Sequence, residues 1–302
     1  MHVDAIQPGD ETQSLTGPRI AGAPSGFANL SVNAVSQLLL AFWAILVIFP
    51  FVWMIVTALK TDPEILSSPW TLPAALQWDN FSRAWTEARI GRFFVNTAIV
   101  LVGSLTGTLL VSSMAAYVLA RFSFPGRQAI FYGFIAGLMF PVFLALVPLY
   151  FLVNDLNLLA TYQGLILVYI AYSLPFTIFF LTAFFKTLPA ELGEAAILDG
   201  ANQYQIFFQI MMPLAKPGLI AMGIFNFLGQ WNQFLLPLVL MPDDNKYLLS
   251  QGLYFLAVQQ GYQNDYGALF AAMVITMVPT LIIYVLFQRR LESGLTAGAL
   301  KG

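Results

Sequence analysis

Six long stretches of the sequence contain no aspartate, glutamate, lysine or arginine, and this pattern restricts the possible folds more than any other feature. They are residues 20–59, 93–120, 128–154, 156–185, 217–242 and 266–288. A transmembrane helix needs roughly 20 predominantly apolar residues, so each stretch is long enough for one span. We therefore predict an all-α membrane protein with six transmembrane helices, at about residues 36–59, 94–120, 128–152, 161–185, 217–241 and 266–288.

The composition agrees with a membrane protein and excludes several kinds of chemistry. Of the 302 residues 59% are hydrophobic and only 9% are charged, whereas a soluble domain carries about 25% charged residues. The chain has no cysteine, and its single histidine is His2. Disulfides, thiolate chemistry and histidine-based catalytic or metal sites are therefore excluded. We expect no catalytic residues, no metal and no cofactor, and without a basic stripe we expect no nucleic-acid partner.

The segments that flank the spans define the predicted domains. Residues 1–30 are polar and rich in Gly and Pro, and they lack the basic start and apolar core of a signal peptide. We predict that they form a disordered cytoplasmic tail. Residues 31–291 are predicted to form the transmembrane domain, in which residues 186–216 make a cytoplasmic loop. Residues 292–302 are predicted to be a second cytoplasmic tail.

The distribution of lysine and arginine predicts the orientation in the membrane. Cytoplasmic segments carry an excess of these residues. With the N-terminus inside, eight lie in cytoplasmic segments and five in external ones. The cytoplasmic set is Arg19, Arg121, Arg127, Lys186, Lys216, Arg289, Arg290 and Lys301, and the external set is Lys60, Arg83, Arg89, Arg92 and Lys246. The bias predicts that both termini are cytoplasmic.

The predicted spans contain neutral polar side chains but no ionisable acid or base. The absence of charge argues against a proton pump or a carboxylate-dependent symporter. In the fifth span Asn226, Gln230 and Gln233 are spaced to share one helix face, with Trp231 and Asn232 beside it. These residues could line a translocation path, where amides bind hydroxyls and an aromatic ring stacks on a sugar. They could equally make interhelical hydrogen bonds, and Trp231 could belong to an interfacial aromatic belt.

Two further sets of span residues are candidates for different roles. Tyr169 and Tyr172 of the fourth span are weaker candidates for the path, because a purely structural role is more common for such residues. Gly103 and Gly107 of the second span are four residues apart. Small residues at this spacing let helix backbones approach closely, so we interpret these glycines as helix-packing positions.

Residues 189–217, PAELGEAAILDGANQYQIFFQIMMPLAKP, form a polar insert between two predicted spans. Pro189 suits a first helical turn, with Thr187 as the cap before it. Asp199-Gly200 predicts a stop and a turn, and a second apolar helix should follow until Pro213. The product is a stiff unit that projects from the membrane, as a mechanical coupling element would. The alternative, an amphipathic helix on the lipid surface, is disfavoured by the three acids of the insert.

This insert resembles the EAA signature found in permease subunits of bacterial ABC importers. Glu194-Ala195-Ala196, Gly200, Ile210 and Pro213 stand at the spacing of that signature, with Met212 in place of the usual Leu. Asp199-Gly200-Ala201 is typical of the carbohydrate-uptake branch. Stretches at 93–100, 115–127, 231–240 and 294–302 are similar to the same branch, and most of all to the second permease of maltose-type systems.

The resemblance implies a fold, a mechanism and a set of partners. The fold would be that of a type I ABC importer permease, in a multi-pass protein of a bacterial cytoplasmic membrane. The insert would dock on the ATPase through Glu194, Ala195, Ala196, Asp199, Gly200 and Ala201, while Ile210 and Pro213 would support its exit geometry. The implied partners are a second permease subunit, an ABC ATPase dimer, an extracytoplasmic solute-binding protein and a neutral solute of the carbohydrate class.

ATP binding is expected on another chain. A phosphate-binding P-loop needs a Gly-Lys pair, and this sequence contains none. The predicted external loop 60–92 carries Trp70, Trp78 and Trp85, and it could meet the solute-binding protein or lie partly in the membrane interface. The alternative function is a stand-alone secondary transporter or channel for a neutral solute. A membrane-embedded enzyme is a third possible class, but the sequence lacks any catalytic arrangement of acids, histidine or cysteine.

Overall fold

The computed structural model describes residues 26–263 and 265–299, and the side chains of residues 34–258 and 265–288. By internal contacts the chain divides into two compact units, residues 1–52 and 53–302. The described part of the first unit is helix α1 (Gly26–Thr57), which runs on into the second unit. It begins well before the predicted span start at residue 36, because no charge or proline interrupts the sequence from Gly26 to Phe49 and extending a helix costs little.

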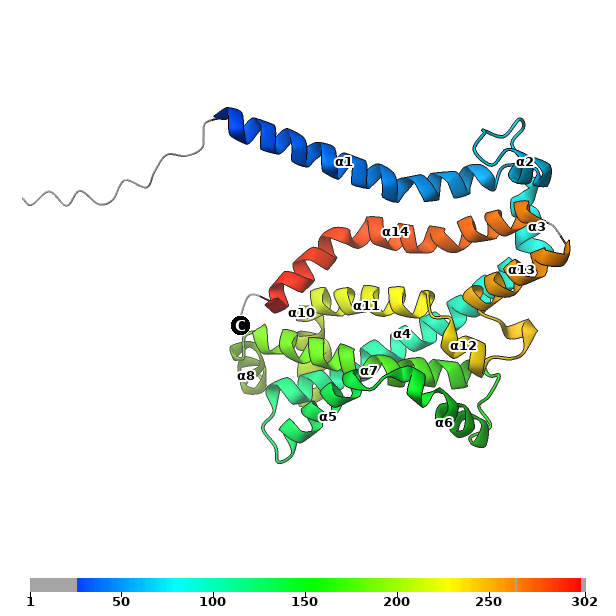
Figure 1. The fold of residues 1–302 in the computed structure, drawn as a ribbon. Helices are drawn as coiled ribbons and strands as arrows, with labels where there is room; N and C mark the ends of the chain where they lie inside the picture. The colour runs from blue at the N-terminus through cyan, green and yellow to red at the C-terminus, as the bar shows by residue number, and fades with distance from the viewer. Residues whose placement is uncertain (1–25, 264, 300–302) are drawn as a thin grey trace, which may run out of the picture. The chain divides into compact units, whose positions relative to one another are not determined.

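The second unit is helical throughout its described residues (Figure 1). Its longer helices are α4 (Ile90–Arg121), α5 (Arg127–Met139), α6 (Val142–Asp155), α7 (Tyr162–Thr187), α11 (Lys216–Trp231), α13 (Leu249–Gln263) and α14 (Tyr266–Ala299). Its shorter elements are α2 (Asp62–Ser67), α3 (Asp79–Thr86), α8 (Glu191–Leu198), α9 (Gln203–Gln205), η1 (Ile206–Met211), α10 (Met212–Leu214), α12 (Leu235–Leu240) and η2 (Asp244–Lys246). Most of the predicted tail 292–302 continues α14, and residues 1–25 and 300–302 lie outside the described residues.

Four described helices are long and apolar enough to cross a membrane, and the number reaches six if each of two bent helix pairs is one span. One bent pair is α5 with α6, whose axes differ by 103°. The bend falls inside the predicted span 128–152. Phe140 has extended backbone angles before Pro141, as expected of a residue that precedes proline. The other bent pair joins residues 203–214 to α11 at 72°.

Helices α4, α7 and α11 pack together at the centre of the second unit (Figure 1). Gly103 and Gly107 of α4 lie against Ile166 and Ile170 of α7, and a Cβ atom at Gly103 would come within 2.8 Å of Ile166 Cδ1. Gly218 of α11 lies in the same way against the ring of Phe184. Glycine at these contacts lets the three helices approach closely.

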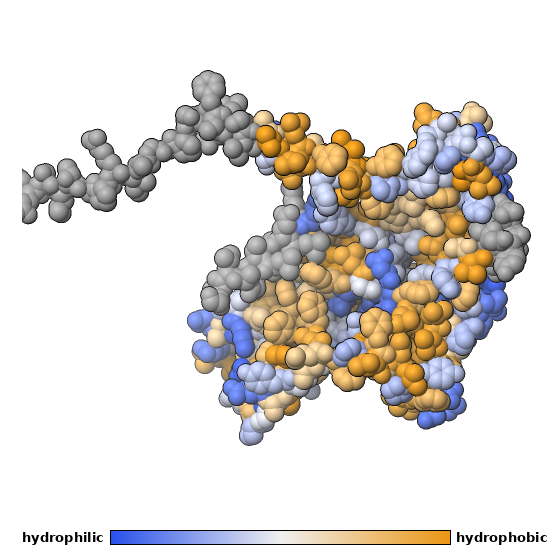
Figure 2. Space-filling model, in the orientation of Figure 1, coloured by the Kyte–Doolittle hydropathy of each residue, from blue (hydrophilic) through white to orange (hydrophobic). Residues whose placement is uncertain are grey.

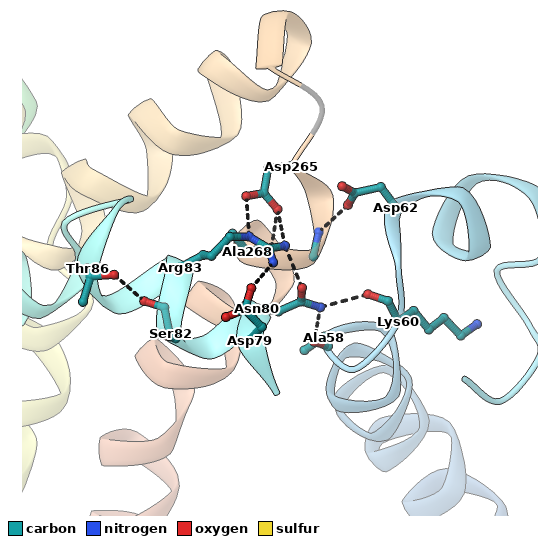
Figure 3. A network of polar contacts seen from close by, with 11 residues as sticks. Ala58, Lys60, Asp62, Asp79, Asn80, Ser82, Arg83, Thr86, Asp265 and Ala268 are labelled. Atoms are coloured by element: carbon teal, nitrogen blue, oxygen red, sulfur yellow. Dashed lines mark hydrogen bonds and ion pairs between the residues drawn. The ribbon is translucent and has the colours of Figure 1, made fainter. Parts of the chain in front are cut away.

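The predicted external loop 60–92 is a folded cap that contains α2 and α3, and Figure 3 shows polar contacts made by its residues. The amide of Asn80 donates hydrogen bonds of 2.8 Å to the carbonyls of Ala58 and Lys60. Arg83 donates to Asp265, and the backbone N–H of Gly267 donates to Asp62. These contacts attach the cap to the start of α14.

Hydrophobic side chains cover much of the visible face of the second unit, whereas hydrophilic ones gather over α8 at one end and around α2 and α3 at the other (Figure 2). Within the spans the exposed residues include large apolar side chains such as Phe143, Leu144 and Val147. A surface of this kind is suited to contact with lipid or with other apolar helices.

Candidate functional site

The polar insert folds as a helix, a glycine turn and a second helical arm. Helix α8 carries Glu191 and Glu194 in its first turn, where negative charge meets the helix dipole favourably. Gly200 has φ +83°, a left-handed conformation that favours glycine. The N–H of Ala201 donates to the carbonyl of Ala196 at 2.9 Å and so closes the turn. The structure confirms the predicted turn at Asp199-Gly200.

The predicted start of the first insert helix is wrong. Thr187 does not cap it but ends α7, where its hydroxyl donates to the carbonyl of Phe184 at 2.8 Å. Leu188 is extended before Pro189, because proline disfavours a helical conformation in the preceding residue. Helix α8 therefore begins at Glu191, and its N-cap residue Ala190 makes no side-chain capping bond.

The motif residues of the insert divide into an exposed set and a buried set. Glu194, Ala195, Asp199 and Gly200 are exposed, and Leu198 beside them is 89% exposed. Ala196 is buried against the membrane-spanning helices, in a cluster that includes Phe185, Ile206, Phe207 and Met211, and Ile210 packs at its edge. One side of α8 is thus packed against the protein, while the other side is exposed.

The second arm holds a feature that the sequence analysis missed. Asn202 and Gln205 form a reciprocal capping box, with bonds of 2.8 and 2.9 Å. The next segment, η1, is a π-helix, which is rare and often found at functional sites. An apolar second helix was predicted, and the Asn-x-x-Gln spacing could have predicted its start. The hydrogen-bond register of a π-helix has no comparable sequence signal. Pro213 lies in α10 after it.

Two contacts connect the insert, and Leu188 just before it, to α4. The Nη2 of Arg121, at the end of α4, donates to the carbonyl of Leu188 at 2.6 Å. The ring of Tyr117, one turn earlier, lies 5.2 Å from the ring of Phe207 between centroids. The insert and the residue before it are therefore in direct contact with a helix long enough to span a membrane.

The buried amides of α11 make interhelical hydrogen bonds. Gln230 accepts from the hydroxyl of Ser104 on α4 and donates to the hydroxyl of Ser173 on α7. Asn226 donates to Thr177 on α7 at 3.0 Å and to the carbonyl of Met222 at 2.9 Å. The two amides are only 5% and 8% exposed. Of the two interpretations left open, the observed contacts of this pair are those of helix association.

Gln233 does not share the helix face of Asn226 and Gln230, so that part of the prediction is wrong. Helix α11 ends at Trp231. Pro237 has no N–H to offer the carbonyl of Gln233, and the hydroxyl of Ser250 donates to that carbonyl at 2.7 Å instead. Asn232 is the exposed C-cap residue of the helix, and its amide donates to the carbonyl of Leu228 at 2.8 Å.

Trp231 is a buried structural residue. It is 5% exposed, and its indole N–H donates to the carbonyl of Thr276 on α14 at 3.2 Å. Its ring stacks on Phe227 with an interplanar angle of 15°. The hydrogen bond joins α11 to α14, whereas the stacking lies within α11.

Tyr172 and Gln233 line one cavity of about 840 Å³ at the bend between α5 and α6. Its other aromatic walls are Phe140, Phe143 and Phe176, and none of its lining residues is charged. Ser173 also lines it and accepts the hydrogen bond from Gln230. Aromatic faces with a few neutral polar groups suit a hydroxyl-rich neutral ligand. Among the described residues there is no cluster of three metal-ligating side chains.

Comparison with known proteins gives consistent results. Residues 108–297 match the family model described as binding-protein-dependent transport system inner membrane component. The diacetylchitobiose uptake system permease protein NgcG of Streptomyces coelicolor is 50% identical over 268 residues, which are 89% of each chain. The trehalose/maltose transport system permease protein MalG of Thermococcus litoralis is 34% identical over 86% of this chain and 93% of its own.

A solved structure shows the same fold. One chain of a bacterial ABC transporter involved in the import of the acidic polysaccharide alginate superposes with a TM-score of 0.77 at 21% identity. The match covers 87% of this chain and 97% of that chain.

Proposed function

This chain belongs to the family of binding-protein-dependent transport system inner membrane components, and we propose that it forms half of the translocation path of an ATP-driven carbohydrate importer. In this proposal both termini are cytoplasmic, and each bent helix pair counts toward six spans in a bacterial cytoplasmic membrane. Family membership favours a subunit of an assembly over a stand-alone transporter or channel.

The observation that carries the coupling role is the two-sided construction of the insert. Ala196 is buried against the spans, while Glu194, Ala195 and Asp199 are exposed on α8 and its turn. We assign the exposed set, with Gly200 and Ala201, to docking on a separate ATPase. Ile210 and Pro213 belong to the arm that leads into α11. Closure of the ATPase would push α8, and the contacts of Arg121 and Tyr117 would pass the displacement to α4.

The solute is proposed to be a neutral carbohydrate. Relatives are named for the uptake of diacetylchitobiose and the transport of trehalose and maltose, and the 840 Å³ cavity has aromatic and amide walls without charge. Tyr172 and Gln233 would contact the solute directly. Asn226, Gln230 and Trp231 would hold the wall helices, and Asn232 would lie at the end of that wall.

Three kinds of partner complete the proposed importer. A second permease would supply the other half of the path, and an ATPase dimer would dock at α8. A solute-binding protein would meet the cap of α2 and α3, where Trp70, Trp78 and Trp85 are 74%, 64% and 45% exposed. One solved complex of similar fold contains the alginate ABC transporter with a pentasaccharide-bound periplasmic protein, at a TM-score of 0.61.

The proposal is tested by enlarging the docking side of the insert. Glu194→Trp or Gly200→Trp should abolish uptake and binding-protein-stimulated ATP hydrolysis in the reconstituted complex. Gln209→Trp is the matched control, because Gln209 is exposed on the same insert but lies outside α8 and its turn. Co-purification of the permease pair would show that the variants assemble. Normal stimulation and uptake in both docking variants would refute the coupling role.

A further inference from the structure

A second cavity, of about 640 Å³, lies between the end of α4, the start of α5 and the end of α7. Figure 1 shows this part of the molecule at the same end as α8. Its walls include two cations, Arg127 and Lys186, and no aspartate or glutamate. Neither cation forms an ion pair within the described part of the chain. The cavity therefore presents positive charge that no carboxylate of its own walls neutralises.

The two cations approach the cavity from different helices. Lys186 is in the last turn of α7, with its Nζ atom 5.7 Å from the centroid of the Phe131 ring of α5. Arg127 is the first residue of α5 and is half-buried. Thr182 precedes Lys186 by one helical turn, and its buried hydroxyl has no hydrogen-bond partner. An anion between α5 and α7 would thus have a cation on each side.

The start of α5 adds a third favourable element. No side chain caps this helix of 13 residues, and Gln128 and Ala129 of its first turn line the cavity. The free N–H groups and the dipole of a helix N-terminus attract phosphate groups. The partial positive charge at the N-terminus of α5 therefore adds to the charges of Arg127 and Lys186 at the same cavity.

The surroundings are those of the boundary between lipid and water. Arg127 and Lys186 stand at the ends of apolar helices, where such side chains reach headgroup level. Tyr132 lines the cavity and is 63% exposed, as expected in an interfacial aromatic belt. No residue of α5 is buried along the whole helix, and Ile130 and Met139 are 49% and 81% exposed. This face could accommodate acyl chains.

We propose that this cavity binds the phosphate group of an anionic phospholipid from the cytoplasmic leaflet, with the acyl chains along α5. The inference rests on the proposed orientation, which puts the α8 end at the cytoplasmic surface. Arg127 and Lys186 make the charged contacts, and the N-terminus of α5 supplies N–H donors. Basic pockets between helices on this side of a membrane are suited to such headgroups.

The test measures lipid binding to the purified full-length chain in neutral detergent by native mass spectrometry. The probes are dioleoylphosphatidylglycerol, dioleoylphosphatidylcholine and soluble glycerol phosphate. The Arg127→Gln/Lys186→Gln double variant should bind phosphatidylglycerol about thirtyfold more weakly, since each basic side chain near a membrane contributes roughly a factor of five. Arg127→Lys/Lys186→Arg, which keeps both charges, should restore most of the affinity.

Lys216→Gln is the matched control, because Lys216 is exposed at the same end of the molecule but does not line the cavity. It should bind phosphatidylglycerol within about twofold of the unmodified chain. Unfolding temperatures would confirm that each variant is folded, and the single variant Lys186→Gln, at an exposed position, serves if the double variant does not fold.

Three outcomes would overturn the proposal. They are equal binding by the unmodified chain and the double variant, equal binding of phosphatidylcholine, and binding of glycerol phosphate without the lipid. The last would show a site for a soluble phosphate. Because the assay needs neither ATPase nor solute, its failure leaves the importer function standing, and failure of uptake would leave the lipid site standing.

Discussion

Arg83 donates two hydrogen bonds, of 3.1 and 3.0 Å, to the carboxylate of Asp265, which stands 182 residues later in the sequence. The pair joins α3 to the residue that precedes α14. The hydrogen bond from Arg83 holds the pKa of Asp265 below its usual value of 3.8, and the N–H of Ala268 contributes in the same direction. Asp265 in turn raises the pKa of Arg83. The charged pair therefore stabilises the cap while both groups are ionised.

Asp265→Asn should lower the free energy of unfolding by about 1 kcal/mol at neutral pH, the upper part of the range for partly exposed ion pairs. The folded-state pKa of Asp265 is depressed, so its contribution is present above about pH 3.8 and is lost as the pH falls through the lower folded-state value. The difference in melting temperature between the unmodified chain and the variant should therefore shrink below pH 3.8.

Asp79→Asn is the control for this pair, because Asp79 also meets Arg83 but its side chain is 70% exposed. It should change stability by less than about 0.5 kcal/mol. A larger effect at Asp79 than at Asp265 would contradict the assignment of the stabilising contact.

Gln230→Leu should destabilise the packing of α11 against α4 and α7 by about 1 kcal/mol, the scale of hydrogen bonds between membrane helices. The substitution removes the acceptor of Ser104 and the donor to Ser173. Reversible unfolding in mixed detergent would measure the loss. Asn232→Leu, at an exposed helix end, should have a smaller effect, and an equal loss in both variants would show that the buried network contributes nothing.

Gly107→Val should destabilise the protein by about 1–3 kcal/mol through overpacking. A Cβ atom at Gly107 would meet the side chain of Ile170 across the interface of α4 and α7. Gly133→Val is the matched control, because nothing lies within 4 Å of a Cβ atom at that helical position. Thermal unfolding should separate the two variants clearly, and identical midpoints would mean that α7 yields to the added side chain.

Tyr172→Ala should reduce uptake by up to about tenfold if the ring stacks on the solute, because stacking on an aromatic side chain contributes up to about 1.5 kcal/mol. Tyr172→Phe keeps the ring and should retain most of the transport. Tyr284→Ala is the control, since Tyr284 and Tyr172 are both 52% exposed but Tyr284 does not line the 840 Å³ cavity. Equal loss in both alanine variants would remove Tyr172 from the path.

The features predicted well from the sequence are those with a local physical cause. Charge-free stretches predict apolar helices because a bilayer excludes charge, and Asp199-Gly200 predicts the turn because glycine readily takes the positive φ that is observed. The EAA spacing identified the family to which the chain belongs. In each case residues of one continuous stretch of sequence carry the signal.

The features that were missed depend on distant residues or on small energetic differences. Just after α11 ends at Trp231, the hydroxyl of Ser250 donates to the carbonyl of Gln233, which Pro237 cannot bond. The extension of α7 through Thr187 moved the start of α8. The π-helical register of η1 accompanies the burial of Phe207 against Tyr117. A short sequence window contains neither Ser250 nor Tyr117, whereas the start of α8 follows from the local effect of Pro189 on Leu188.

The burial of Lys60 affects how positive charge is distributed between the two ends of the second unit. Its side chain is 0% exposed and donates to the carbonyls of Ser68 and Pro69 at 3.0 Å. The other cations assigned to the external side have polar side-chain partners. They are Arg83, Arg89, Arg92 and Lys246, which meet Asp265, Asp244, Asn245 and Asp243.

At the opposite end Arg127, Lys186 and Lys216 form no ion pair within the described residues. In the proposed orientation, the external cations are therefore better neutralised by ion pairs than the cytoplasmic cations whose side chains are described. In the proposed orientation, an anionic leaflet would attract Arg127, Lys186 and Lys216 more strongly than a simple residue count suggests, which would favour that orientation across the bilayer.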